Sequence, residues 1–361
     1  MDYKRLGDYI RPVDIRNRDL KIHLSQGICN AKYFQNPKQV ADNPETHKVV
    51  RTGQFAYNRA TTRNGEKISI ALREGPECTV SSAYQVFEVI DENQLDSRYL
   101  MMWFKRPEFD RLAIFYSHGS AHEFFEWDAM CDVMLPIPPI TRQREIVEEY
   151  ETVAQRIRLN NQMIQHLEAT AQALYRKTFV DNIDKENLPE GWRMGTLGEV
   201  ANIKAGGDKP HDFSEVQTEE YNVPVYANGI ENKGIFGFTT KPVITTKSIT
   251  ISARGTIGYC FLRKRPFVPI VRLIVVIPHD EDVTQYLFYY LNNSNIKGSG
   301  SVQSQLTVPD MESKNIIIPP VPLIQEFNKQ VEIIDNSISF CEKENEKLIE
   351  LQSLLLAKMG Q

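Results

Sequence analysis

Two stretches of this chain, LPIPPITRQREIVEEY at 135–150 and IIIPPVPLIQEFNKQV at 316–331, decide the fold that the remaining sequence predicts. In both, a short apolar run ends in a pair of prolines and is followed by a long charged segment. Proline ends a strand because it lacks an N–H group, and it is well tolerated in the first turn of a helix. The two stretches therefore predict two strand-to-helix boundaries, one in each half of the chain.

The segments that follow the proline pairs have the apolar spacing of coiled-coil helices. Apolar residues recur at alternating intervals of four and three, which is the 3.5-residue period of a coiled-coil seam. Some 40 residues of helix are roughly 60 Å long. The predicted seam comprises Ile146, Val153, Ile157, Asn160, Ile164, Leu167 and Leu174 in the first helix and Ile334, Ile338, Asn345, Leu348 and Leu355 in the second. We therefore expect two long helices that pair with each other.

Each predicted seam contains one asparagine, Asn160 or Asn345. A polar residue in a seam costs stability and fixes the register of the helices. If the helices pair antiparallel about their midpoints, the residue numbers across the seam sum to about 505, and 160 + 345 = 505. We therefore expect the two amides to face each other. Contact of each with solvent or with a partner protein is the alternative.

The two halves of the chain resemble each other beyond these boundaries. RLGDYI at 5–10 opens the first half, and TLGEVANI at 196–203 opens the second. Runs dense in β-branched and aromatic residues predict strands, at 68–72, 84–90, 243–251, 259–262 and 267–277. One helix is predicted between the strands and the proline pair of each half, at 97–104 and 283–292. The sequence thus contains a weak internal duplication.

These patterns predict an α+β protein with two β-rich domains separated by two long antiparallel coiled-coil helices, related by an internal pseudo-twofold repeat. A chain of 361 residues is long for one core and sufficient for two domains. The expected parts are a first domain at 1–138, a first long helix at 139–181, a second domain at 182–319 and a second long helix at 320–361.

The composition is that of an ordinary globular protein, with 41% apolar and 25% charged residues. No apolar run approaches the roughly 18–20 residues that span a bilayer. The N-terminal residues are polar, so no secretory signal is expected. The five cysteines are scattered, without the spacing of a zinc or redox site. We therefore expect a cytoplasmic protein with reduced thiols and no contact with a membrane.

Positive charge is concentrated within each half, although the net charge of the chain is −5. Residues 48–73 carry six cations and one anion, giving 6 − 1 = +5. Residues 200–275 carry ten cations and six anions, giving 10 − 6 = +4, whereas 322–361 carry 4 − 7 = −3. Segregated basic segments of this kind indicate an anionic partner such as nucleic acid.

No motif of a catalytic centre is recognisable in the sequence. A P-loop, a glycine-rich dinucleotide turn, a nucleophile elbow and an amino-methyltransferase motif are all missing. Asp310, Glu312 and Lys314 superficially resemble a metal-dependent nuclease signature, but the two carboxylates are too close in sequence to converge on a metal from separate strands. We expect a polar turn there, and no catalytic residue and no metal site. A nuclease is the alternative.

Several motifs, taken in order, resemble the specificity subunits of type I restriction-modification systems, and the resemblance covers nearly the whole chain. They are Gln143-Arg144-Glu145 and Gln325-Glu326 after the proline pairs, LPEGWRMGTLGEV at 188–200, VVRTGQFAYN at 49–58, TVSSAYQVFEV at 79–89 and TISARGTIGYCFLRKRPFV at 250–268. The first half departs from the pattern because it lacks the LPxGW lead-in.

The resemblance implies a non-catalytic subunit with two target-recognition domains that read a bipartite, asymmetric site on double-stranded DNA. It implies that two DNA methyltransferase subunits, and restriction subunits in the complete enzyme, are directed to that site. The long helices would serve as spacer and docking surface. No cofactor would belong to this chain, because S-adenosylmethionine, ATP and Mg²⁺ would be bound by the partner subunits.

The candidate DNA-binding residues lie in the basic segments of both halves. Cations neutralise phosphates, whereas Arg and Asn have the geometry to read guanine and adenine. Arg59 and Arg254 are favoured because each ends an apolar strand beside small residues. The full set is Tyr57, Asn58, Arg59, Arg63, Asn64 and Lys67 in the first domain and Lys204, Lys209, Lys247, Ser252, Arg254, Lys264 and Arg265 in the second. A coiled-coil adaptor that binds protein alone is a second alternative; it explains the helices but not these basic segments.

Overall fold

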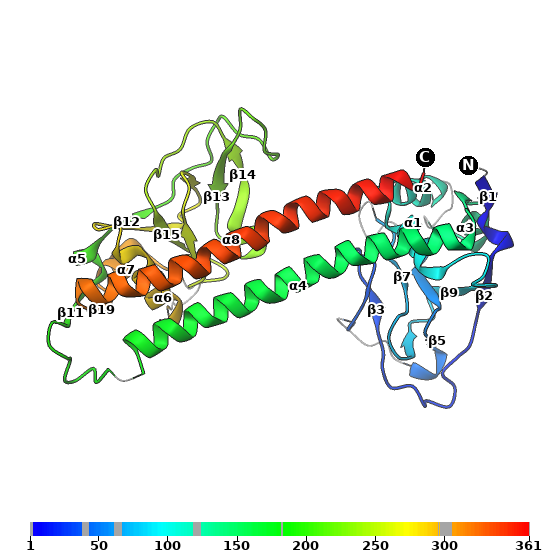
Figure 1. Ribbon diagram of the computed structural model, residues 1–361, viewed down its shortest axis with the longest axis horizontal. Coiled ribbons are helices and arrows are strands. Elements are labelled where there is room, and N and C mark those ends of the chain that lie inside the picture. Colours follow the sequence, from blue (N-terminus) through cyan, green and yellow to red (C-terminus); the bar gives the residue numbers. More distant parts are fainter. Residues whose placement is uncertain are drawn as a thin grey trace. The chain divides into compact units, whose positions relative to one another are not determined.

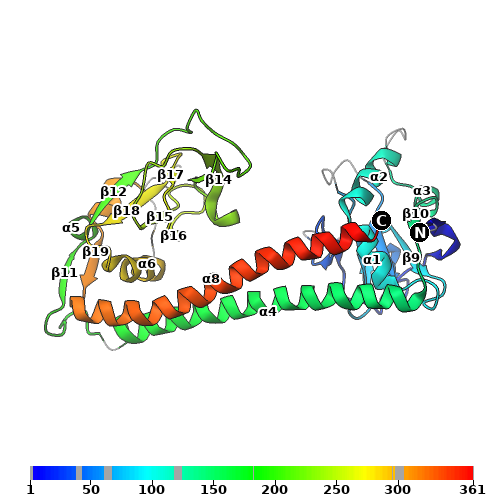
Figure 2. The same ribbon diagram turned by 45° about the horizontal axis from the view of Figure 1, so that its top comes forward.

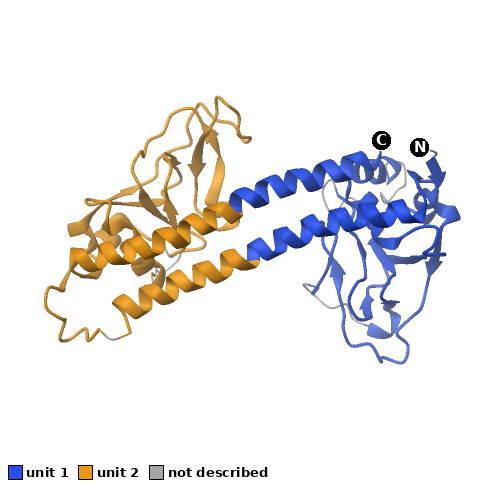
Figure 3. Cartoon of the chain, in the orientation of Figure 1, with its two compact units in different colours: residues 1–161, 342–361 blue, residues 162–341 orange. Residues whose placement is uncertain are grey.

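The computed structural model describes residues 3–37, 43–60, 67–117, 124–181, 183–294, 296 and 305–360. The chain divides into two compact units, coloured separately in Figure 3. Unit 1 comprises residues 1–161 and 342–361, and unit 2 comprises residues 162–341. Two long helices, α4 (Ile140–Phe179) and α8 (Val321–Lys358), each contribute to both units. In the described part of the chain, no helix has the length and apolarity needed to cross a membrane.

Unit 1 is built on an antiparallel sheet in the order β2-β9-β6-β7. The strands are β2 (Ile10–Val13), β9 (Tyr84–Val89), β6 (Phe55–Asn58) and β7 (Ile70–Leu72). Successive side chains of a strand point to opposite faces. Accordingly, Phe55 and Tyr57 pack into the main core, whereas Ala56 belongs to a second core on the other face.

Helices cover one face of the unit 1 sheet and a strand pair covers the other (Figure 1). The main core includes side chains of α1 (Ser97–Lys105), α2 (Pro107–Ser117), α3 (Trp127–Cys131) and the unit 1 parts of α4 and α8. The opposite face is covered by β5 (Lys48–Val50), which pairs with β8 (Cys78–Val80). A short pair, β3 (Gly27–Ile28) with β4 (Phe34–Gln35), adjoins this second core.

Unit 2 contains a four-stranded antiparallel sheet and a separate three-stranded sheet. The larger has the order β12 (Ala201–Ala205), β18 (Ile274–Pro278), β15 (Ser248–Ile251) and β16 (Cys260–Arg263). The smaller has the order β14 (Ile235–Thr239), β13 (Val223–Tyr226) and β17 (Val268–Pro269), with β13 and β17 parallel. Helix α6 (Val283–Asn293) lies between the larger sheet and α8 (Figure 2).

Aromatic rings hold the long helices to α6 within unit 2. The ring of Tyr175 on α4 stacks 5.9 Å from Tyr289 on α6, and Phe327 on α8 lies 5.6 Å from the same Tyr289 ring. Phe179 extends the cluster, 4.9 Å from Tyr286. These rings are nearly fully buried, so their burial is a main contribution to the stability of unit 2.

The same edge module occurs once in each unit and accounts for the repeated Leu-Gly of the sequence. In unit 1, β1 (Tyr3–Arg5) pairs with β10 (Met134–Pro136), and in unit 2, β11 (Arg193–Thr196) pairs with β19 (Asn315–Ile318). Each first strand leads into a short helix, η1 (Leu6–Asp8) or α5 (Leu197–Val200), and each second strand leads into a long helix.

Glycine follows the buried leucine of each short helix because a second helix packs against it. A Cβ on Gly7 would lie 2.7 Å from Cys131 Cβ of α3, which no side chain tolerates without movement. A Cβ on Gly198 would lie 3.2 Å from the Glu312 carbonyl oxygen of α7 (Val308–Glu312). The repeated glycine is therefore a packing requirement.

The two long helices run antiparallel where they pack in each unit, and the asparagines meet as the register predicts. Asn160 Nδ2 donates to Asn345 Oδ1 at 3.0 Å, and Asn345 Nδ2 donates to Asn161 Oδ1 at 2.9 Å. Asn160 Nδ2 also donates to Glu344 Oε2 at 2.8 Å, and Glu344 pairs with Arg156 at 3.0 Å. Every predicted seam residue is buried or partly buried in the structure.

The C-terminal turn of α8 is part of the core of unit 1. Met359 is 3% exposed and packs in the main core of that unit. Tyr3 Oη donates to the Gly360 carbonyl oxygen at 2.9 Å. The first strand and the last helical turn of the described chain therefore lie side by side in unit 1 (Figure 1).

Two predicted strands of the second half were wrong in extent. The predicted strand at 243–251 begins at Ser248, because Val243 and Ile244 bond to Phe267 instead. The predicted strand at 267–277 is two strands, β17 and β18, in different sheets. The break falls at Val271 and Arg272, whose φ angles are 53° and 58°. Apolarity alone did not distinguish one buried strand from two that face different cores.

Candidate nucleic-acid interface

Four loops of unit 2 meet at one end of its larger sheet. The register places Ala205 beside Ile274, Ile274 beside Ile251, and Ile251 beside Cys260. These are the last residues of β12 and β15 and the first of β18 and β16. The loops at 206–213, 252–259 and 270–273 therefore leave the sheet at the same end, and the turn at 227–234 joins them. We call these four segments the unit 2 loop cluster.

Asn228 is the side chain that connects the loop cluster. Its Oδ1 accepts a hydrogen bond from the Ala253 N–H at 2.7 Å, and its Nδ2 donates to the Val271 carbonyl oxygen at 2.7 Å. The backbone completes the connection, because Val271 N–H donates to the Gly207 carbonyl oxygen at 2.8 Å. One amide thus holds three separate loops in a defined arrangement.

Two pairs of adjacent non-glycine residues in this cluster have left-handed backbones. Asn232 and Lys233 have φ angles of 48° and 53°, and Val271 and Arg272 have φ angles of 53° and 58°. This conformation costs roughly 1–2 kcal/mol per residue, and it is rare for a β-branched residue such as valine. All four side chains are exposed. Strained backbone that presents exposed side chains is characteristic of binding sites.

A buried arginine supports the turn at 227–234. Arg263 is 5% exposed, and its Nη2 donates to the Lys233 carbonyl oxygen at 2.7 Å. Its guanidinium also lies over the Tyr226 ring at 3.5 Å and donates through Nε to Thr250 Oγ1 at 2.9 Å. Burial lowers the pKa of Arg263 to about 10, so it remains charged at neutral pH. The structure thus gives this cation an internal role.

The loop cluster contains some of the predicted DNA-binding residues of unit 2. Arg254 is exposed, and its Nη2 donates to Gln305 Oε1 at 3.0 Å. Lys209 is exposed with its Nζ 3.5 Å from the centre of the Phe213 ring, and Lys204 is exposed on β12 next to the same sheet end. Ser252 was predicted to contact DNA, but its side chain is 2% exposed and its hydroxyl donates to the Arg254 carbonyl oxygen at 3.3 Å, so it is not presented to a ligand.

The remaining predicted residues of unit 2 lie at the other end of the sheet. Lys247 precedes β15, and Lys264 and Arg265 follow β16, at the end where Ser248 pairs with Arg263. Lys264 forms an ion pair with Asp335 of α8 at 2.8 Å. The structure therefore does not bring these three cations together with Arg254.

The predicted residues of unit 1 surround the end of β6. Tyr57 is a correction: it is fully buried in the aromatic core, 6.0 Å from the Phe125 ring, so it is not presented to a ligand. Asn58 accepts from the Ala60 N–H at 3.1 Å, and partly buried Arg59 pairs with Glu126 at 3.3 Å. Lys67 is exposed. The predicted residues Arg63 and Asn64 lie outside the described residues.

A buried ion pair anchors the backbone at Ile68. Lys32 Nζ lies 2.8 Å from Asp110 Oδ1, and the same oxygen accepts from the Ile68 N–H at 3.1 Å. Burial lowers the pKa of Lys32, and the hydrogen bond to Asp110 opposes that shift. Lys32 also donates to the Phe104 carbonyl oxygen. The partners are distant in sequence, so no local pattern indicated this pair.

The sequence analysis missed three exposed or connecting residues of the loop cluster, namely Asn228, Asn232 and Arg272. Asn228-Gly229 has the composition of a turn, which was a usable signal. Arg272 was not recognised as a candidate because it lay inside the predicted strand at 267–277. Its left-handed backbone follows from contacts with 206–207, which no local pattern encodes.

Of the residues that resembled a nuclease signature, Asp310 and Glu312 lie in the short helix α7 and Lys314 follows it, so the expected polar turn is a helix there. Asp310 Oδ2 accepts from Thr307 N–H at 3.0 Å and from Thr307 Oγ1 at 2.6 Å, which is a capping box at the start of α7. Among the residues that the structure describes, no group of three or more His, Cys, Asp or Glu could hold a metal ion. All five cysteines are free, and burial raises the pKa of Cys78 to about 11 and of Cys260 to about 12.

Comparison with known proteins identifies the class of protein. The family model of the type I restriction modification DNA specificity domain matches this chain twice, at residues 45–169 and 189–353. The chain therefore belongs to that family, whose members are specificity subunits without catalytic activity of their own. The two matches coincide with the two halves of the internal repeat.

Individual relatives agree with the family. A putative type I specificity subunit of Mycoplasma pneumoniae, S.MpnORF89P, is 33% identical over 165 residues, covering 45% of this chain and 48% of that protein. The HindI specificity subunit of Haemophilus influenzae is 20% identical over 422 positions, covering 92% and 91%. The chain spans about half the length of the first two curated relatives it matches.

A solved structure has the same fold. It is the S subunit of a type I restriction-modification system from M. genitalium, with a TM-score of 0.58 and 15% sequence identity, covering 100% of this chain and 96% of that one. The predicted mixed fold, with two β-rich specificity domains and two long helices that pack against each other, is confirmed.

Proposed function

We propose that this chain reads a bipartite, asymmetric site on double-stranded DNA, one part with each unit, and directs two DNA methyltransferase subunits and restriction subunits to it. The observation that carries the proposal is the double match to the specificity domain in two halves of different sequence. Two unlike domains imply two unlike half-sites. S-adenosylmethionine, ATP and Mg²⁺ belong to the partner subunits, and the assembly works in the cytoplasm.

In unit 2, the loop cluster is the surface that we propose to enter a DNA groove. Its exposed cations Lys209, Lys233, Arg254 and Arg272 come from four different segments that the Asn228 amide and the backbone hold together. Lys209 and Lys233 suit phosphate contacts, which are insensitive to sequence. Arg254 and Arg272 have the planar donors that read guanine in the major groove.

In unit 1, we propose that Asn58, Arg59 and Lys67 flank the DNA-reading segment. Asn58 ends β6 and Arg59 follows it, and Lys67 precedes Ile68, which is held by the buried Lys32–Asp110 pair. The two ends of this segment are therefore fixed to the core. Flanking residues that are already ordered lose less conformational entropy on binding.

The two long helices are the proposed docking surface for the methyltransferase subunits. Large apolar side chains are exposed on both helices, including Met163, Ile333, Phe340, Leu351 and Leu354, which are 43–70% exposed. Exposed apolar clusters of this kind favour a protein partner. In unit 2, Met163, Ile333 and Phe340 line a groove of about 620 Å³ between the helices.

The test combines the full chain with a type I methyltransferase subunit and genomic DNA. We expect methylation at one bipartite sequence, mapped by methylation-sensitive sequencing, and no methylation or cleavage when the chain is incubated alone with Mg²⁺ and DNA. Methylation without sequence preference would contradict the proposal, and cleavage by the chain alone would support the nuclease alternative. Failure to shift DNA in the presence of the methyltransferase would support the adaptor.

Arg254→Ala tests the loop cluster within that experiment. We expect binding to weaken by about 1–3 kcal/mol and preference to relax at one position of one half-site, because one guanine contact is lost. Arg265→Ala, an exposed cation at the other end of the sheet, is the matched control and should leave the preference unchanged. Equal effects of the two substitutions would remove the loop cluster from the proposal.

A further inference from the structure

Unit 1 contains a cavity that is lined by none of the residues proposed above to contact DNA. Its volume is about 650 Å³. It lies between α1 and the N-terminal part of α4, and the segments at 32–34 and 72–75 complete its wall. Pockets of roughly 300–1,000 Å³ bind small molecules and cofactors.

One side of the cavity is apolar and rigid. Met101 and Met102 of α1 are 6% and 2% exposed, and Tyr150 of α4 is 7% exposed. Tyr33, at 56% exposure, adds a second aromatic ring. Lys105 Nζ lies 5.0 Å from the centre of the Tyr150 ring, so Tyr33 presents the exposed flat surface on which a planar ring can pack.

The polar lining is dominated by positive charge. Five cations line the cavity, namely Lys32, Arg73, Arg98, Lys105 and Arg158, against two acids, Glu74 and Glu151. Lys32 is paired with Asp110, and Arg98 with Asp96 and Glu151. For Arg73, Lys105 and Arg158, the described part of the chain supplies no acidic partner within ion-pair distance.

Arg73 is the most informative of these cations because it is buried. It is 7% exposed, and its Nε and Nη1 donate to the Pro76 carbonyl oxygen at 2.6 Å and to Gln26 Oε1 at 2.5 Å. Both acceptors are neutral, so they satisfy hydrogen bonds but not the charge. A buried charge is costly unless an opposite charge compensates it. An anion bound in the cavity would provide that compensation.

The residues around the Arg73 guanidinium leave room for it and fix the neighbouring turn. Gly75 follows two residues later, and a Cβ on Gly75 would lie 3.2 Å from Arg73 Nη2. Thr52 Oγ1 donates to the Gly75 carbonyl oxygen at 2.8 Å, which fixes the turn. The guanidinium also lies 5.2 Å from the Phe34 ring centre.

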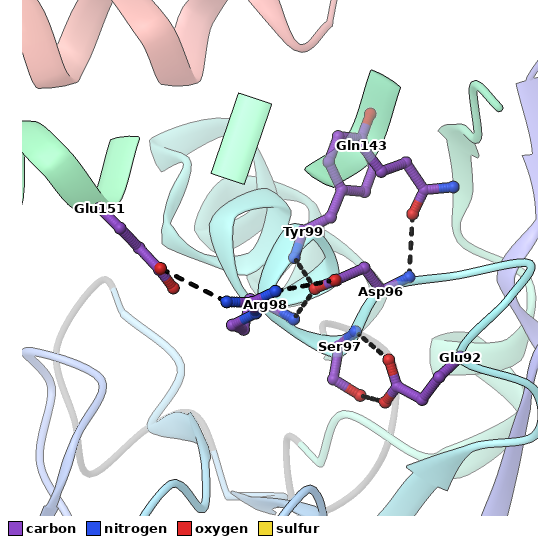
Figure 4. A network of polar contacts seen from close by, with 7 residues as sticks. All are labelled: Glu92, Asp96, Ser97, Arg98, Tyr99, Gln143 and Glu151. Atoms are coloured by element: carbon purple, nitrogen blue, oxygen red, sulfur yellow. Dashed lines mark hydrogen bonds and ion pairs between the residues drawn. The ribbon is translucent and has the colours of Figure 1, made fainter. Parts of the chain in front are cut away.

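A polar network fixes the opposite wall of the cavity (Figure 4). Asp96 Oδ1 accepts from the Arg98 N–H at 2.8 Å and caps α1, while Arg98 Nη1 donates to Glu151 of α4 at 3.4 Å. Gln143 Oε1 accepts from the Asp96 N–H at 2.9 Å and joins the same two helices. These hydrogen bonds fix the position of α1 relative to α4.

The corresponding gap of unit 2, between α6 and α8, is bridged by side chains. Asp335 of α8 accepts from Gln285 of α6 at 2.7 Å and from Lys264 at 2.8 Å. Side chains therefore bridge the corresponding helices in both units.

We propose that the unit 1 cavity binds a nucleoside phosphate. The phosphate groups contact Arg73, Lys105 and Arg158, and the planar base packs on Tyr33, the exposed aromatic ring of the lining. A volume of about 650 Å³ exceeds what inorganic phosphate needs and suits a base, a ribose and phosphates. The proposal is independent of DNA reading, because no residue of the proposed DNA surfaces lines the cavity.

The test measures binding of ATP, CTP and inorganic phosphate to the full chain by calorimetry, together with the thermal stability of unit 1. We expect saturable binding of a nucleotide below about 1 mM, with a rise in unfolding temperature, because a ligand of the native state stabilises it. Lys105→Gln with Arg158→Gln should weaken binding at least tenfold. Ala154→Trp, which fills the cavity from α4, should abolish it.

Arg144→Gln is the matched control, since Arg144 is an exposed cation on α4 outside the cavity, and it should leave binding unchanged. Absence of saturable binding, or binding that the rim variants leave intact, would overturn the proposal. Inorganic phosphate bound as tightly as a nucleotide would also overturn it, because no base is then recognised. If duplex DNA alone competes for these cations, the phosphates belong to DNA; this overturns the inference while DNA reading stands.

Discussion

The two units share a framework but hold their recognition segments by different means. Both have the same edge strands, the same Leu-Gly helix start and a long helix after a proline pair. In unit 2, a neutral side chain, Asn228, connects the loops by hydrogen bonds. In unit 1, a buried ion pair, Lys32–Asp110, holds the backbone at Ile68. The difference teaches that the duplication preserved the framework, while each recognition surface has its own internal support.

The contacts between the two long helices also differ between the units. In unit 1 they are joined by polar side chains, including Asn160, Asn345 and the Arg156–Glu344 pair. In unit 2, the described helix contacts are aromatic and aliphatic, with Tyr175, Phe327 and Val331 in one core. Polar contacts define a register at a cost in stability, whereas apolar burial supplies stability.

The largest expected effect comes from breaking the buried ion pair. Lys32→Met should destabilise unit 1 by about 3–5 kcal/mol, because it leaves the Asp110 carboxylate buried without its cation. Urea unfolding followed by tryptophan fluorescence measures this, in a Trp192→Phe background so that Trp103 and Trp127 of unit 1 report. Lys21→Met, which removes an exposed pair with Asp19, should cost far less, because a solvent-exposed ion pair contributes little to stability. Equal losses would show that burial is not the cause.

The next largest effect is expected from Asn228, the side chain that connects the loops of unit 2. Asn228→Ala removes two hydrogen bonds and should cost about 1–3 kcal/mol. It should also relax sequence preference in the half-site read by unit 2 while the other half-site is unchanged. Methylation-site sequencing measures both half-sites at once, and Asn222→Ala, at an exposed loop position, is the control. Loss of preference in both half-sites would contradict the separate support of the two surfaces.

A smaller effect distinguishes the repeated glycines. Gly7→Ala places a Cβ 2.7 Å from Cys131 Cβ and should cost about 1–3 kcal/mol, whereas Gly198→Ala places one 3.2 Å from a carbonyl oxygen and should cost less. Thermal unfolding of the two variants gives the comparison. A greater loss from Gly198→Ala would mean that α7 is less able to move than α3.

The smallest effect is the pH response of the helix pair in unit 1. The hydrogen bond from Arg156 holds the pKa of Glu344 below its usual value of 4.5, and Asn160 adds to this. A depressed carboxyl pKa contributes stability above the unfolded pKa and loses it as pH falls through the folded pKa. Glu344→Gln should therefore reduce acid sensitivity slightly below about pH 4.5. If this variant unfolds in acid like the unchanged protein, Glu344 does not contribute to the acid sensitivity of unit 1.

The sequence predicted the periodic parts of the fold better than its binding surfaces. The helices, the seam and the facing asparagines follow from spacing along the chain, because helical burial repeats at a fixed period. Tyr57 and Ser252 were expected at the surface, but Tyr57 faces the core side of β6, and Ser252 is buried just after β15 with its hydroxyl bonded to the Arg254 carbonyl oxygen. Arg272 was missed because contacts with a distant loop set its backbone. Lys264 was grouped with Arg254 although they lie at opposite sheet ends, since nearness in sequence does not fix which end a residue occupies.

The burial of Met359 in unit 1 has a consequence for synthesis. Unit 2 is one continuous segment, complete once residue 341 has left the ribosome, whereas unit 1 also needs residues 342–361. In the nascent chain, part of the apolar core of unit 1 therefore stays exposed to solvent until residues 342–361 have been synthesised. We expect that nascent chains bind chaperones through the half that was made first, and that the half made second reaches its native state earlier.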